Sequence, residues 1–215
     1  EAHSILDIWV YLSGSPLLAL FITLGAYQLG LLAYQRSGQN PLANPVAIAV
    51  LLVACLIQAT GTPYATYFAG AQFVHFLLGS ATVALAVPIY RGLDAIRGRA
   101  LPLLLSLCTG GAVSILSAIG FAWWLGIDHK LVLPMLAKSV TAPIAMGIAE
   151  RIGASPTLTA VYAVVTGILG AILARWVLDL LGMKSAWQRG FATGVAAHGI
   201  GTSRAFSISA ECGAY

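Results

Sequence analysis

The sequence is short of charged residues. Only 8% of its 215 residues are Asp, Glu, Lys or Arg, whereas a soluble globular domain carries about a quarter. So few charges cannot cover the surface of a water-soluble fold. The net charge of +4 is small and scattered over short segments, which argues against nucleic-acid binding. We therefore expect no nucleic acid among the partners.

Cysteines and the motifs of common active sites are also lacking. Cys55, Cys108 and Cys212 are too far apart for a metal site or a disulfide framework, so we expect them to be packing residues. The chain holds neither a CxxC nor an HExxH pattern, and its glycine run HGIGTSR does not follow a strand as a nucleotide-binding loop would. We expect no catalytic residue, metal or cofactor, and hence no enzyme.

Apolar residues dominate what is present. They make up 59% of the chain, and the mean hydropathy is +0.89. Apolar runs recur at about 20 residues, the length that spans a bilayer, with Lys and Arg between them. The pattern predicts an all-α polytopic membrane protein with about six transmembrane helices in a single transmembrane domain over residues 1–215. The clearest runs are 16–34, 45–59, 71–90, 101–125 and 156–181.

The ends of these runs predict the topology. Residues 1–15 lack the basic start of a secretory signal and suit an interfacial helix, with Trp9 and Tyr11 at headgroup depth. Arg91, Arg97 and Arg99 form the densest basic cluster, which places their loop in the cytoplasm.

Two segments, 131–153 and 191–211, are too polar for helices that face lipid. The run 101–125 should end outside and the run 156–181 inside, so 131–153 must enter and return on the outer side. Irregular backbone at membrane depth is tolerated only inside protein or beside a water-filled cavity. We therefore expect both segments to be broken or re-entrant and to share one site.

A weak internal similarity suggests a repeat. SATVALAVPI at 80–89 aligns without gaps to SVTAPIAMGI at 139–148. Weak internal symmetry of this kind is typical of transporters built from repeats, so the fold is expected to be transporter-like.

Four stretches carry a family resemblance: LLGSATVALAVPIYR, LAKSVTAPIAM, PTLTAVYAVVTGILGA and AAHGIGTSRA. In this order they resemble the LrgB/CidB family of bacterial inner-membrane proteins, which includes the C-terminal part of the plant plastid glycolate/glycerate translocator. The resemblance covers about 16–215. Because members usually continue through one more apolar segment, it implies a further helix after Tyr215.

The resemblance implies two kinds of function in the bacterial inner (cytoplasmic) membrane. One is secondary transport of small monocarboxylates such as glycolate, glycerate or pyruvate. The other is an antiholin-like influence on murein hydrolase export and cell lysis. It also implies a small holin-like partner of the LrgA/CidA type. A homo-oligomer, with a dimer favoured, is expected for such folds.

The residues of the two polar segments favour transport of an anion. A carboxylate that leaves water needs replacement hydrogen bonds and countercharge. Helix N-termini, hydroxyls and cations supply both, and glycines in HGIGTSRA would let the backbone unwind toward a ligand. The coupling ion would be H⁺ or Na⁺. The expected substrate-binding residues are Lys138, Ser139, Thr141, His198, Gly199, Gly201, Thr202, Ser203 and Arg204, and secondary candidates are His75, Ser80, Thr82, Glu150 and Glu211.

Each candidate has a structural alternative. Small and hydroxyl residues also let membrane helices pack closely. Lys138 and Arg204 could reach the interface or pair with Glu150 and Glu211. His198 could be a neutral core histidine, a proton carrier or a ligand contact. An antiholin-like regulator would need association surfaces but no deep charged pocket.

Overall fold

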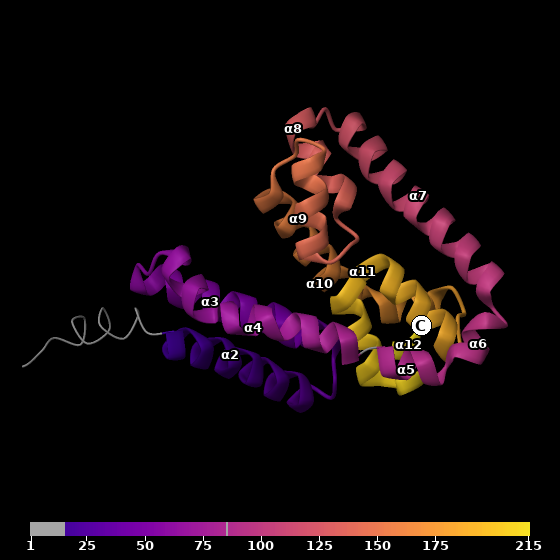
Figure 1. The fold of residues 1–215 in the computed structure, drawn as a ribbon, viewed down its shortest axis with the longest axis horizontal. Helices are drawn as coiled ribbons and strands as arrows, with labels where there is room; N and C mark the ends of the chain where they lie inside the picture. The colour runs from indigo at the N-terminus through magenta and orange to yellow at the C-terminus, as the bar shows by residue number, and fades with distance from the viewer. Residues whose placement is uncertain (1–15, 85) are drawn as a thin grey trace, which may run out of the picture. The chain divides into compact units, whose positions relative to one another are not determined.

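A computed structural model describes residues 16–84 and 86–215, except for the side chains at positions 75, 76, 78, 79, 81, 82, 88 and 95. The expected interfacial helix at 1–15 lies outside the described residues. The described chain forms helices and no strand (Figure 1). It divides into two compact units, unit 1 (Glu1–Ala86) and unit 2 (Val87–Tyr215).

Unit 1 consists of helices, and local capping marks the start of α3. Its elements are α2 (Pro16–Arg36), η1 (Pro41–Ala43), α3 (Pro45–Thr60) and α4 (Tyr64–Ala84). The Asn44 side-chain oxygen accepts hydrogen bonds from the backbone N–H groups of Val46 and Ala47, at 2.9 and 3.1 Å. Pro45 occupies the first turn, where its missing N–H costs nothing. Gly61 ends α3 with φ 64°, a conformation that favours glycine.

The start of α4 differs from the expected one. The apolar run predicts a helix from residue 71, but α4 begins at Tyr64. Its first turns pack on α2, where the hydroxyls of Tyr67 and Thr23 are hydrogen-bonded at 2.6 Å. The helix therefore extends seven residues before the apolar run, over a segment that contacts α2.

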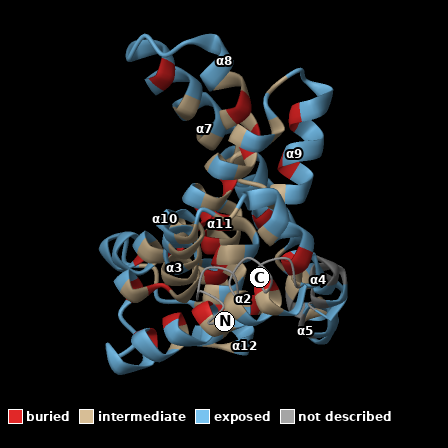
Figure 2. Ribbon diagram, turned by 90° about the vertical axis from the view of Figure 1, so that its left-hand side faces the viewer, coloured by how far each residue is buried: buried red, intermediate tan, exposed pale blue. Residues whose placement is uncertain are grey.

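Unit 2 is built around α10. Its elements are α5 (Ala86–Arg91, beginning at the unit boundary), α6 (Leu93–Arg97), α7 (Ala100–Trp124), α8 (His129–Val132), η2 (Leu133–Ala137), α9 (Ala142–Arg151), α10 (Pro156–Leu180), α11 (Ala186–Ile208) and α12 (Ala210–Ala214). Ser155 caps α10 by accepting from the Leu158 N–H at 3.3 Å, as the Ser-Pro pair predicts. Buried residues, red in Figure 2, gather on α10 and α11. In contrast, α7 runs along the outside of this unit (Figure 1), and only 6% of its central stretch is buried.

Three described helices, α2, α7 and α10, are long and apolar enough to cross a membrane. The apolar helix α3 has 16 residues, and at about 1.5 Å per residue it reaches about 24 Å, less than the roughly 30 Å hydrocarbon core. The described chain is therefore all-helical with three candidate spans, and the count of about six stays a prediction.

The structure differs from two further predictions, the internal repeat and the packing role of the cysteines. Ser80 lies inside α4, whereas the aligned Ser139 lies between η2 and α9, so the local structure does not follow the proposed repeat. Cys212 is buried, as a packing residue should be, but Cys55 and Cys108 are exposed. The packing prediction is wrong for these two because they lie on faces of α3 and α7 that no described element of their own unit covers.

The contact between α2 and α3 depends on a glycine. A Cβ atom at Gly30 would lie 2.6 Å from the Pro45 carbonyl oxygen, whereas a Cβ at Gly25 would meet nothing within 4 Å. We expect Gly30→Ala to destabilise unit 1 by about 1–3 kcal/mol through overpacking. Gly25→Ala should be neutral or stabilise the helix by up to about 1 kcal/mol. Thermal unfolding of the detergent-solubilised variants tests this, and equal shifts in Tm would contradict it.

Candidate functional site

The first helix break lies between η2 and α9, at residues 138–141. Thr141 caps α9 in an extended conformation, with φ −58° and ψ 141°, but its side chain makes no capping hydrogen bond. Pro143 in the first turn has no N–H to donate. The backbone N–H groups of Ala142 and Ile144 therefore have no acceptor within their helix. Such a helix start favours a negative ligand.

The second break lies inside α11. Ala197 (φ −130°, ψ 16°) and His198 (φ 43°, ψ −138°) leave the helical conformation. A left-handed φ at a residue other than glycine costs about 1–3 kcal/mol and needs support from its surroundings. Support comes from α10, where His198 Nε2 lies 2.8 Å from the Ala163 carbonyl oxygen. Because a carbonyl only accepts, Nε2 carries the hydrogen, and Nδ1 remains able to accept one.

The position of this break corrects the expected role of two glycines. The sequence predicts unwinding at Gly199 and Gly201, but the backbone leaves the helical conformation just before them, at Ala197 and His198. Gly201 is buried, and a Cβ there would lie 2.6 Å from the Thr193 carbonyl oxygen. Gly201 is thus a helix-packing position. The helix unwinds at the residue that hydrogen-bonds to α10, His198, and not at the glycines, whose backbone is the more permissive.

Both breaks meet on α10. The buried side chain of Ala163 packs with Ala137 and Ala145, against which Val140 also packs. The carbonyl of the same Ala163 binds His198. A Cβ at Gly199 would lie 3.5 Å from Thr141 Cγ2, so the start of α9 adjoins the second half of α11. Two helix N-termini therefore lie side by side, as the shared polar character of the two segments predicts.

Lys138 adds a positive charge at the first break. Its Nζ donates to Ser114 Oγ of α7 at 2.7 Å and to Ser139 Oγ at 3.3 Å, and the two hydroxyl oxygens are 3.0 Å apart. The side chain is half-buried. Within residues 16–84 and 86–215, no carboxylate lies within ion-pair distance of Lys138, and Glu150 is exposed. The alternative that Lys138 pairs with Glu150 is therefore wrong.

Residues after the second break make mostly local contacts. Thr202 Oγ1 donates to the His198 carbonyl oxygen at 3.0 Å, so this hydroxyl serves the break itself. Ser203 is exposed. Arg204 donates through Nη1 to Ser207 Oγ at 3.0 Å. Arg204 lies six residues past His198, which is about 9 Å along a helix.

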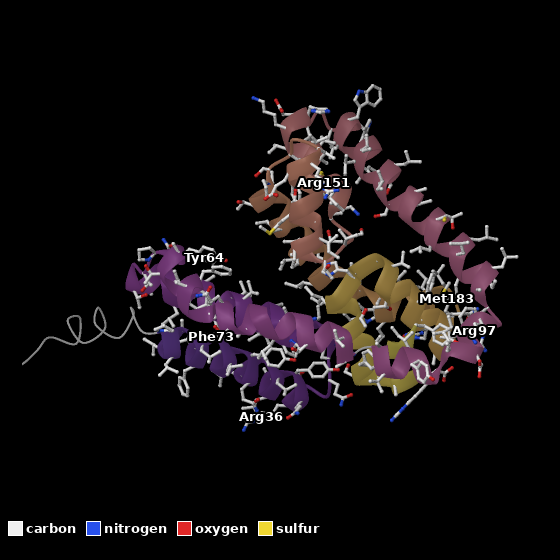
Figure 3. All side chains as sticks on the ribbon, viewed as in Figure 1. Arg36, Tyr64, Phe73, Arg97, Arg151 and Met183 are labelled. Atoms are coloured by element: carbon white, nitrogen blue, oxygen red, sulfur yellow. The ribbon has the colours of Figure 1, made fainter. Side chains whose placement is uncertain are left out.

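Two of the secondary candidates, Glu150 and Glu211, lie in unit 2, and both are exposed. Glu211 is exposed in the first turn of α12. Ser80 is exposed on α4, in unit 1. The side chains of His75 and Thr82 lie outside the description. Arg151, labelled in Figure 3, closes α9 at the end opposite the break.

One site residue, Ser114, is not predicted from the sequence. It is one of several small polar residues in the apolar helix α7, and nothing in the sequence separates it from Ser106 or Ser117. Only the packing of α7 against the first break identifies it.

Long apolar helices, together with polar helices interrupted where they pack inside the protein, define a helical membrane protein. Residues 23–215 match the LrgB-like family, and the chain belongs to that family. It is 31% identical over 197 residues to the uncharacterized protein YwbG of Bacillus subtilis, covering 92% of this chain and 87% of YwbG. The uncharacterized protein YxaC of the same organism is 33% identical over 189 residues, covering 88% of this chain and 82% of YxaC.

A third relative has a name that describes an activity. The holin-like protein CidB of Staphylococcus epidermidis is 28% identical over 181 residues, covering 84% of this chain and 79% of CidB. No solved structure matches the chain.

The support of the second break by α10 can be tested at Gly167. A Cβ there would lie 2.7 Å from His198 Nε2 and 2.8 Å from Ile200 Cδ1. Gly167→Ala should therefore push His198 away from Ala163 and destabilise the protein by about 1–3 kcal/mol. Gly147→Ala on α9, where a Cβ meets nothing within 4 Å, is the matched control. The measurement is Tm from tryptophan fluorescence in detergent, and an unshifted Tm for Gly167→Ala would show that the contact is dispensable.

Proposed function

We propose that this protein is a secondary transporter of small monocarboxylates of the glycolate, glycerate or pyruvate class, with several spans in the bacterial inner membrane. The observation that carries the proposal is the environment of Lys138. Its half-buried ammonium is held by two hydroxyls and has no carboxylate of the described chain within ion-pair distance. Lys138 lies four residues before Ala142, the first residue of α9. Partial burial of a charge without a countercharge is unfavourable, even where hydroxyls solvate it. A bound carboxylate would remove that cost.

The positive charge at the two breaks suits a small anionic substrate. Lys138 contributes one full positive charge, and each adjoining helix start contributes about half a charge through its aligned peptide dipoles. The backbone N–H groups of Ala142 and Ile144 would donate to carboxylate oxygens.

A transport cycle needs a part that carries the substrate and a part that does not. Both breaks, Lys138 and its serine partners lie in unit 2, whereas unit 1 has its own helix contacts. We propose that unit 2 bears the substrate and that alternating access moves it against a scaffold. In this scheme the coupling ion is H⁺ or Na⁺, and Nδ1 of His198 is a candidate proton carrier. The scheme involves no cofactor and no catalysis, and a homodimer is the proposed assembly.

A second candidate function is supported by the names of relatives. The printed description of CidB as holin-like supports a membrane regulator of murein hydrolase export and cell lysis more directly than it supports transport. Such a regulator would act through helix surfaces and a small LrgA/CidA-type partner. The exposed helix α7 offers a surface of this kind. This function leaves the unpaired Lys138 unexplained.

Uptake by purified protein in liposomes tests the first function. We expect saturable uptake of labelled glycolate or pyruvate, and we expect Lys138→Gln to reduce it at least about tenfold because a charge-assisted contact is lost. Lys130→Gln, which removes an exposed lysine from the turn before η2, should leave uptake unchanged. Uptake measured with and without a pH gradient identifies proton coupling. Equal uptake by wild type and Lys138→Gln would remove Lys138 from the site.

The second function predicts a different result in cells. If regulation of lysis does not depend on transport, Lys138→Gln should return murein hydrolase release in a deletion strain to the wild-type level, as the wild-type protein does. If lysis control follows from transport, the variant should fail while its membrane level stays normal. Folded wild-type protein without uptake, alone and with its holin-like partner, would favour the regulator.

A further inference from the structure

We propose that Ser114 of α7 is a substrate-positioning residue, which holds the Lys138 ammonium at the first break and so makes α7 part of the carboxylate site. The proposal rests on the function proposed above and deepens it. Nothing in the sequence assigns α7 to the site. The assignment comes from the contact of 2.7 Å between Lys138 Nζ and Ser114 Oγ.

The hydrogens of this cluster can be counted. Lys138 Nζ lies within 3.3 Å of both serine oxygens and uses two of its three N–H groups on them. One serine hydroxyl donates to the other across 3.0 Å. The second hydroxyl hydrogen and the third ammonium hydrogen are left for a ligand. The cluster therefore offers one hydroxyl donor and one ammonium donor close together. Two such donors suit the two oxygens of one carboxylate.

Ser114 is used differently from the other hydroxyls of its helix. Thr109 donates to the Leu105 carbonyl at 2.8 Å, and Ser117 donates to the Ser114 carbonyl at 3.3 Å, both within α7. In the described chain, the side-chain hydrogen bonds that join α7 to another element all end on Ser114. Most other side chains of α7 are exposed, and only Leu103 and Ala122 of this described helix are buried. Ser114 is thus the polar link between an outlying helix and the break.

Without the contact to Ser114, the Lys138 ammonium could move toward water. A lysine stem is flexible, and its ammonium moves toward water where it can. Ser139, the neighbouring residue, contacts Nζ at the longer distance of 3.3 Å. Removal of the Ser114 hydroxyl should therefore leave Lys138 present but badly placed, which weakens substrate binding more than turnover.

The first experiment compares substrate dependence of uptake in liposomes. Ser114→Ala should raise KM for glycolate about tenfold, the usual loss for one hydrogen bond to a charged group, with maximal rate within about twofold. Ser114→Thr, which keeps a hydroxyl, should recover most of the affinity. Ser117→Ala is the matched control on the same helix and should behave as wild type. Should Ser114→Ala fail to fold, Ser114→Cys preserves the volume while weakening the hydrogen bond.

A second experiment does not depend on transport. Modification of Lys138 by an amine-reactive reagent, followed by mass spectrometry, should be severalfold faster in Ser114→Ala than in wild type or Ser117→Ala, because the ammonium is no longer held. Unchanged KM and unchanged reactivity would overturn the role of Ser114 while transport stands. If wild type shows no saturable uptake, the carboxylate function fails instead, and with it the positioning role. The reactivity then reports only whether Ser114 holds Lys138.

Discussion

The hydrogen bond between His198 and the Ala163 carbonyl is the interaction on which the site depends. A helix interrupted at membrane depth frees backbone groups that lipid cannot satisfy. His198 also holds a left-handed φ that is unfavourable outside glycine. Its contact with α10 stabilises this conformation, and the small Gly167 leaves the space for the imidazole ring. The contact with the capped helix α10 therefore stabilises the break in α11.

The same helix places the first break beside the second. The side chain of Ala163 packs with Ala137 and Ala145, on either side of the first break, while its backbone oxygen binds His198 of the second. One residue of α10 thus fixes both irregular segments through different atoms. Small residues are needed there because larger ones would hold the broken helices apart. Close packing around Ala163 is what holds the start of α9 in place. The small residues can therefore serve packing and ligand binding at once.

Local capping accounts for several of the observed helix boundaries. The pairs Asn44-Pro45 and Ser155-Pro156 mark the starts of α3 and α10 because capping acts within a few residues. Polar content was enough to predict two unusual segments. It could not locate the second break at Ala197 and His198, since glycine two residues on only permits unwinding and a tertiary hydrogen bond decides where it happens.

Other features depend on contacts between distant residues. Ser114 looks like any other serine in an apolar helix until Lys138 lies beside it. The early start of α4 at Tyr64 follows from packing on α2. Likewise, a ten-residue alignment of small residues could not predict that Ser80 is helical and Ser139 is not, because such residues are compatible with both conformations.

The position of Lys138 bears on the choice between the two functions. A protein that acts only by helix association can meet its needs with small residues and exposed apolar surface, both of which α7 has. A half-buried lysine without a carboxylate in the described chain lowers stability in such a protein and is readily replaced by an apolar residue. Its place beside two open helix starts lowers the free energy only when a negative group binds. The same geometry can serve a holin-like protein if the anion it binds controls the association of its helices, and in that case regulation and carboxylate binding would share one site.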